Sequence, residues 1–136
     1  MPISFNAALG SHEQALQLRA ERMQVLASNI ANAETPGYKA KDFNFAEALK
    51  QATGKQTTGN GVRMQTTQAG HMSAQGTTSM GAEMQYRVPM QPTIDGNSVD
   101  IQQERAKFSE NAVAYQTTLK ILNGKFKGMM GALKGE

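Results

Sequence analysis

The chain has 136 residues, enough for one domain, and only 39% of them are apolar, which is thin material for a dense core. It contains no cysteine and only two histidines, which excludes disulfides and thiolate sites and leaves little for a metal site or for acid–base catalysis. The formal net charge of +3 is concentrated in the C-terminal stretch from Lys120 and is too sparse for a nucleic-acid-binding surface.

A long helix is predicted from about Phe5 to Asn32, within a first segment that spans residues 1–33. The stretch has no proline, and no glycine after Gly10, and Leu26 widens its apolar stripe. Large apolar residues repeat in it every seven positions: Leu9, Leu16, Met23 and Ile30. A seven-residue repeat of this kind is typical of a helix that packs along another helix.

A sharp turn is predicted to end this helix. Pro36 disfavours the helical conformation of the residue before it, and Gly37 can take the positive φ that a type II turn needs at its third position. Asn29 and Asn32 share one face of the helix end. Their amides could bond local carbonyls or the backbone of a partner subunit, or they could be no more than a polar helix end; we expect them to fix the turn and to make a contact between subunits.

A second, short helix is predicted after the turn, within a segment that spans residues 34–50. Asn44 and Glu47 have the spacing of a capping box, in which the first residue caps the helix and the second bonds back to it. The short helix is therefore expected from Phe45 to Gln51.

Residues 51–98 are predicted to form a connector between the two ends of the chain. Its first part, Gln51–Gly81, is dominated by Gly, Thr, Gln and Ser and contains no Leu, Ile, Phe or Trp. Such a segment cannot bury enough apolar surface to offset its ordering entropy, so we expect it to be mobile in the isolated chain. The part from Glu83 to Ile94 is expected to be an extended arm or a short strand, and Pro89 and Pro92 argue against a central strand.

A second long helix is predicted from about Val99 to Leu133, in a last segment that spans residues 99–136. Asp100 and Glu104 in its first turns and lysines in its last turns complement the helix dipole. One row repeats every seven residues: Ile101, Phe108, Tyr115, Leu122 and Met129. A second row lies four residues behind the first: Arg105, Ala112, Leu119, Phe126 and Leu133.

The predicted fold class is mainly α, with two long terminal helices packed as an antiparallel coiled-coil hairpin and a short irregular or weakly β connector. A hairpin of two helices leaves half of each apolar stripe in water, so we expect a subunit that completes its core against other subunits. The residues of this predicted assembly seam are Leu9, Leu16, Met23, Leu26, Ile30, Ile101, Phe108, Tyr115, Leu119, Leu122, Phe126 and Met129.

The end of the first helix resembles the N-terminal signature of bacterial flagellar rod, hook and hook-associated proteins. The residues that carry this resemblance are Asn29-Ile30-Ala31-Asn32 and Thr35-Pro36-Gly37-Tyr38. Asn97-Ser98-Val99-Asp100, with the heptad helix that follows, is similar to the C-terminal segment of the same family. Glu34 departs from the Asn or Asp that many members have. Because the chain lacks the large β domains of hook and distal-rod proteins, it most resembles the proximal rod proteins.

The resemblance implies a structural subunit of the flagellar basal-body rod, the axial drive shaft that transmits torque from the motor to the hook. Its implied partners are copies of itself and other rod proteins, with the membrane-ring adaptor at the rod base as a further candidate. It would be made in the cytoplasm and exported by the flagellar type III apparatus into the periplasm without a cleaved signal. No cofactor, small-molecule substrate or nucleic acid is implied.

A short hydrophobic element near the N-terminus marks export substrates of this family, and Phe5 and Leu9 are the candidates here. The same two residues also fit the first turn of the apolar stripe, and the two interpretations are compatible. The first basic residue is Arg19, and no apolar run approaches the ~20 residues of a membrane span. The sequence therefore predicts a protein that is cytosolic or that leaves the cell by a route that cuts no signal.

Two other function classes compete with a rod subunit. A soluble helical adaptor or secretion chaperone of a type III system would also be helical, but it would lack the Thr-Pro-Gly-Tyr turn and would fold stably alone. An enzyme or a nucleic-acid-binding protein would need a nucleophile–base pair, a phosphate loop, metal-ligand spacing or a basic and aromatic surface, and the sequence shows none of these. We therefore predict that the protein is not an enzyme.

Overall fold

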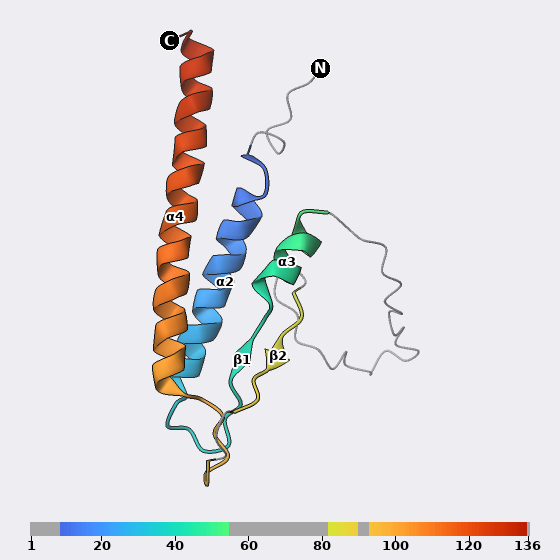
Figure 1. Cartoon of the computed structure of the whole chain (residues 1–136), viewed down its shortest axis with the longest axis vertical. Helices are drawn as coiled ribbons and strands as arrows, with labels where there is room; N and C mark the ends of the chain where they lie inside the picture. Colours follow the sequence, from blue (N-terminus) through green and yellow to red (C-terminus); the bar gives the residue numbers. More distant parts are fainter. Residues whose placement is uncertain (1–8, 55–81, 90–92, 136) are drawn as a thin grey trace, which may run out of the picture.

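The chain is mainly helical in a computed structural model that describes residues 9–54, 82–89 and 93–135. The described helices are α2 (His12–Ala31), α3 (Phe45–Ala52) and α4 (Ile101–Lys134), and the described strands are β1 (Lys41–Asp42) and β2 (Gln85–Tyr86). Figure 1 shows α2 and α4 side by side, with the strands and α3 next to α2. No helix in these residues is long and apolar enough to span a bilayer.

The predicted N-terminal helix is interrupted at Gly10. Gly10 takes a left-handed φ of +62°, and Ser11 is the N-cap of a helix that starts at His12. The prediction of an unbroken helix from about Phe5 is therefore wrong at Gly10, where glycine permits a backbone conformation that other residues resist. Phe5 itself lies outside the described residues.

The two other predicted helices are confirmed within one or two residues. α3 is capped by Asn44, whose Oδ1 accepts hydrogen bonds from the backbone N–H groups of Ala46 and Glu47. α4 is capped by Asp100, whose Oδ1 accepts hydrogen bonds from the backbone N–H groups of Gln102 and Gln103. α4 ends at Gly135, which has a left-handed φ of +75°. Both N-caps follow from the preference of short polar side chains for this position.

The connector contributes a short strand, β2, in the part from Glu83 to Ile94, for which an extended arm or a short strand was predicted. β2 pairs with β1 in an antiparallel two-stranded sheet, with Lys41 opposite Tyr86 and Asp42 opposite Gln85. The partner strand β1 was not predicted, because two residues carry no readable alternation. Most of the stretch Gln51–Gly81, for which mobility is expected, lies outside the described residues.

The two long helices run antiparallel. Asn29 near the end of α2 contacts Glu104 near the start of α4, and the carbonyl of Arg19 accepts from Asn111 at 2.8 Å. At the other end, Lys125 Nζ lies 3.4 Å from the carbonyl oxygen of Leu9. Residue numbers therefore fall along α4 as they rise along α2, as Figure 1 shows.

A small apolar core lies between α2, α3 and the strand segments, on the side of α2 away from α4 (Figure 1). Its buried members are Leu18, Phe43, Ala48 and Ala82. Partly buried residues pack around them: Val25, Phe45, Leu49, Ala52 and Met84. This core fixes α3 and the sheet to α2, so that the contact between α2 and α4 has to be made by other residues.

Candidate assembly interface

The predicted turn after α2 is confirmed and is tied to the start of α4. The N–H of Tyr38 donates to the carbonyl of Thr35 at 3.2 Å, and Gly37 has a φ of +73°. The N–H of Gly37 donates to the carbonyl of Asp95 at 2.9 Å, and the N–H of Ser98 donates to the carbonyl of Tyr38 at 3.0 Å. The turn and the segment before α4 therefore form one hydrogen-bonded junction.

Asn97 closes this junction from the other side. Its side chain is buried, and its Nδ2 donates to the carbonyls of Asn32, Ala33 and Thr35 at 3.0, 2.8 and 2.9 Å. Carbonyls at a helix C-terminus have no partner within the helix, so an amide from outside it satisfies them. Its Oδ1 accepts from the N–H of Val99 at 2.8 Å. One side chain thus links the end of α2 to the start of α4.

Asn29 holds the strand β1 against the two helices. It is fully buried; its Oδ1 accepts from the backbone N–H of Lys41 at 3.1 Å, and its Nδ2 donates to the carbonyl of the same residue at 2.7 Å. The hydroxyl of Tyr38 donates to Oδ1 at 3.2 Å. Because Asn29 has no exposed surface, its amide serves contacts inside the subunit. Asn32 donates to the carbonyl of Ser28 at 2.8 Å, which is the local alternative considered for it.

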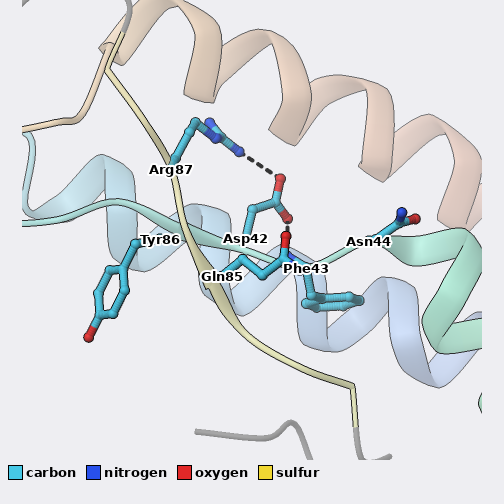
Figure 2. A pocket seen from close by; sticks show the side chains of 6 residues that line it. All are labelled: Asp42, Phe43, Asn44, Gln85, Tyr86 and Arg87. Atoms are coloured by element: carbon cyan, nitrogen blue, oxygen red, sulfur yellow. Dashed lines mark hydrogen bonds and ion pairs between the residues drawn. The ribbon is translucent and has the colours of Figure 1, made fainter. Parts of the chain in front are cut away.

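Four charged side chains from separate segments form a cluster beside Asn29. Arg22 of α2 makes two hydrogen bonds of 3.0 Å to the carboxylate of Asp42 on β1. Arg87, directly after β2, contacts both Asp42, at 2.6 Å, and Glu104 of α4. Figure 2 shows Arg87 turned toward Asp42 across the sheet. Two arginines thus face two carboxylates, and each charge has an opposite charge within contact.

The cluster shifts the ionisation of its members. Burial alone would raise the pKa of Asp42, but the hydrogen bonds and charge of Arg22, a bond from the N–H of Phe43 and the charge of Arg87 together hold the pKa of that carboxyl below its ordinary value. The hydrogen bond to Asp42 raises the pKa of Arg22 in turn. Both groups therefore stay charged at neutral pH.

The contact between α2 and α4 is more polar than predicted. On α4 the buried residues are Glu104, Asn111, Thr118 and Leu122. Each of the first three lies one position before a member of the second predicted row. One position on an α-helix is a rotation of about 100°, so the buried residues point in a different direction from that row. The buried residues of α4 thus combine this polar row with Leu122 of the first predicted row.

The predicted seam residues differ in exposure accordingly. Leu9, Leu26 and Leu122 are buried, and Leu119 and Phe126 are 38% and 37% exposed. The other members are half-buried: Leu16, Met23, Ile30, Ile101, Phe108, Tyr115 and Met129. Leu133, in the second predicted row, is 88% exposed. The subunit alone thus covers its apolar rows only in part.

The half-covered row of α2 lies on the side of that helix away from α3. Leu16 and Met23 stand two residues before Leu18 and Val25, which pack toward α3, and two residues on a helix point about 160° apart. On α4, Leu119 and Phe126 keep 38% and 37% of their surface exposed. Both helices therefore present apolar surface that the subunit does not fully cover.

We call these partly exposed apolar residues of the two helices the outer apolar face. It consists of Leu16, Met23 and Ile30 on α2 and of Ile101, Phe108, Tyr115, Leu119 and Phe126 on α4. Of the family motif, Thr35, Pro36 and Gly37 are exposed, whereas Ile30, Asn32 and Tyr38 are half-buried.

The charged cluster and Asn111 were not predicted as functional residues. Glu104 was interpreted only as a dipole-complementing residue of the first turns. A signal was available, since Glu104, Asn111 and Thr118 repeat every seven residues beside the apolar row that starts at Ile101, and a polar row next to an apolar one needs polar partners if it is buried. No pattern in the sequence pairs Glu104 with Arg87, because that pairing depends on the register of β2.

The described residues contain no group of three or more His, Cys, Asp or Glu side chains placed to hold a metal ion. The recess shown in Figure 2 is lined by Asp42 and Arg87, which already bind each other, and by the exposed edge of the sheet.

Known proteins similar to this chain agree with the signature at the end of α2. A family model described as flagella basal body rod protein matches residues 9–39. The chain is 48% identical to the flagellar basal body rod protein FlgB of Aeromonas hydrophila, over 100% of this chain and 99% of that protein. It is 46% identical to the FlgB protein of Salmonella typhimurium, over 96% and 95% of the two chains, and 47% identical to that of Escherichia coli, over 95% and 94%. These relatives are rod proteins, and none of their names refers to a catalytic activity. The chain therefore belongs to the FlgB family of flagellar basal body rod proteins.

Proposed function

We propose that this rod protein works as a proximal rod subunit whose helices α2 and α4 form an antiparallel coiled coil with those of neighbouring subunits. Its neighbours are copies of the same chain and other rod proteins of the same architecture. No chemical step is part of this function, which is to build a rigid shaft that carries torque through the periplasm.

The observation that carries the proposal is the outer apolar face. Exposed apolar surface on a folded subunit is unfavourable in water and commonly marks a protein contact when it is contiguous. Leu119 and Phe126 lie one heptad apart on α4 and keep more than a third of their surface exposed. Heptad spacing is the pattern that lets a second helix pack along the first over several turns.

Rigidity of the subunit supports the same proposal. The junction at Asn97 and the charged cluster at Glu104 fasten both ends of the chain to each other and to the sheet. A subunit whose two helices are bound in this way resists twisting of one helix against the other. Torque then passes between subunits through the outer apolar face.

The proposed export element adds an order of events. Leu9 is only 7% exposed in the folded chain, so an export receptor can bind it only before the chain folds. We expect the chain to pass through the type III apparatus unfolded and to fold when it meets the growing rod. Export thus precedes assembly, and the two processes use the same segment in succession.

The test replaces Leu119 by glutamate in a strain that depends on this chain for its rod. Leu119→Glu adds a charge that has no partner once the face is covered, so we expect loss of the chain from isolated basal bodies and loss of motility. Ala106→Glu is the matched control, because Ala106 is exposed on the other side of α4. Unfolding by urea should be similar for both purified variants. Normal incorporation of Leu119→Glu would overturn the proposal.

A further inference from the structure

A row of polar side chains is buried where α4 lies along α2. Glu104, Asn111 and Thr118 are 1%, 2% and 7% exposed, and they follow one another at intervals of seven residues. We call these three residues the polar row. Helices that pack along each other usually place apolar residues at such positions, so the polar row lowers the stability that the contact between the two helices supplies.

Glu104 can be buried only when a third segment is in place. Its carboxylate forms an ion pair with Arg87, directly after β2, and accepts a hydrogen bond of 3.0 Å from Asn29 of α2. A buried carboxylate without an opposite charge is strongly unfavourable. The start of α4 therefore packs on α2 only once β2 lies beside both helices, which couples the pairing of the helices to the formation of the sheet.

Asn111 and Thr118 weaken the contact further along the helix. The Nδ2 of Asn111 donates to the carbonyl of Arg19 at 2.8 Å, but its Oδ1 is buried and meets no hydrogen-bond partner among the described residues. An unsatisfied buried acceptor costs free energy on folding. The hydroxyl of Thr118 donates to the carbonyl of Ala114 in its own helix at 2.9 Å, so this bond does not reach α2.

We infer that the polar row keeps the pairing of α2 and α4 weak in the isolated chain, so that the chain remains fit for export until it reaches the rod. The inference rests on the proposed passage of an unfolded chain through the export apparatus, and it adds the residues that limit folding before assembly. In the rod, neighbours that cover the outer apolar face supply the stability that the polar row withholds inside the subunit.

Replacing two members of the polar row by apolar residues tests the inference. Leucine has the branched shape of asparagine and valine that of threonine, so Asn111→Leu with Thr118→Val removes polar atoms and keeps the shapes. The carbonyls of Arg19 and Ala114 lose little, because each lies inside a helix and already accepts from the backbone N–H four residues on. We expect a higher urea midpoint for this purified double variant. In cells with an intact export apparatus, we expect its periplasmic fraction to be at least several-fold lower than that of the wild-type chain.

The matched control places the same two substitutions at exposed positions of α4. Thr117 is exposed and makes the same kind of bond to its own helix as Thr118, to the carbonyl of Val113 at 2.9 Å. Asn123 is exposed as well. Thr117→Val with Asn123→Leu therefore gives a chain of identical composition, and it should leave both the urea midpoint and the periplasmic fraction near the wild-type values.

A further variant separates the effect of stability from a local effect on export. Leu18→Ala, added to Asn111→Leu with Thr118→Val, removes a fully buried side chain from the apolar core next to α3. Because a cavity in a core lowers stability, the urea midpoint and the periplasmic fraction should both return toward the wild-type values.

The outcomes separate this inference from the proposed function. A raised midpoint with unchanged export overturns the inference and leaves the rod function standing, and so does export that stays low once Leu18→Ala has restored the midpoint. A midpoint no higher than that of the wild-type chain, both in the double variant and in Thr118→Val alone, overturns it too, because the polar row would then not weaken the contact. Absence of the wild-type chain from the periplasm contradicts the proposed export itself.

Discussion

The amide of Asn29 donates to the carboxylate of Glu104 at 3.0 Å, and both side chains are buried although 75 residues separate them in the chain. This bond joins the residue that opens the family signature to the first turns of the last helix. Glu104 also forms an ion pair with Arg87. These two contacts explain how a charged residue of α4 can be buried. The subunit is thus held together at its junction end by polar bonds more than by apolar packing.

Glu104→Ala should destabilise the subunit strongly. The substitution leaves the guanidinium of Arg87 without its partner on α4 and one donor of Asn29 unsatisfied. Removing one partner of a buried ion pair typically costs about 3–5 kcal/mol. Urea unfolding of the purified chain measures the loss. Glu110→Ala, at an exposed position on the same helix, should change stability by less than about 0.5 kcal/mol. Equal stability of the two variants would show that the cluster is not structural.

Asn97→Ala should also weaken the subunit, by about 1–3 kcal/mol, because three carbonyls just after α2 lose the hydrogen bonds from its buried side chain. Asn97→Asp should be no better than alanine, since a carboxylate would place its charge against those same carbonyls. Asn44→Ala, which removes an exposed helix cap, is expected to cost about 1 kcal/mol. A smaller effect at Asn97 than at Asn44 would argue against the junction.

Gly37→Ala and Gly124→Ala should have opposite signs. An added Cβ meets nothing within 4 Å at either position, so packing does not distinguish them. Gly37 has a φ of +73°, where alanine costs about 1–2 kcal/mol, whereas Gly124 lies inside α4, where alanine gains up to about 1 kcal/mol. Thermal unfolding of the two variants compares them. A stabilising Gly37→Ala would show that the turn does not require its left-handed backbone.

The stability of the subunit should fall at acidic pH through Asp42. Because its folded-state pKa is lower than the ordinary value of 3.8, the stabilisation is fully present above that value and is lost as the pH falls through the folded-state pKa. Asp42→Asn removes this contribution, so the difference in stability between wild type and variant should shrink as the pH drops below about 4. Urea midpoints measured across this range check it. A difference that is independent of pH would contradict the assignment.

The helices and the turn could be predicted from local signals. Proline followed by glycine after an amphipathic stretch marks the end of α2, and Asn44 and Asp100 mark the starts of α3 and α4. The break at Gly10 was missed because the heptad repeat of apolar residues continues across it. A single glycine is compatible with either a helix or a turn, and only its backbone conformation decides between them.

The candidate interface could be predicted only in part. Heptad spacing identifies which apolar residues of a helix share one face. It does not show which of the adjacent rows of α4 is buried inside the subunit. That choice depends on Asn111 and Glu104, whose bonds reach the backbone of Arg19 and the side chain of Arg87. Such pairings depend on the register of distant segments, which the periodicity of one helix does not contain. The buried residues of α4 consequently include Glu104, Asn111 and Thr118 beside Leu122.

Amide hydrogen exchange on the purified chain at low concentration, compared with the same chain in isolated basal bodies, tests the central claim most directly. The account predicts slow exchange at the junction in both states, because its amides are bonded within the subunit. It predicts fast exchange in the last turns of α4, beyond Lys125, for the isolated chain and strong protection of the same turns in the rod. Strong protection along all of α4 in a verified monomer would contradict it, because the helix would then need no neighbour to complete its fold.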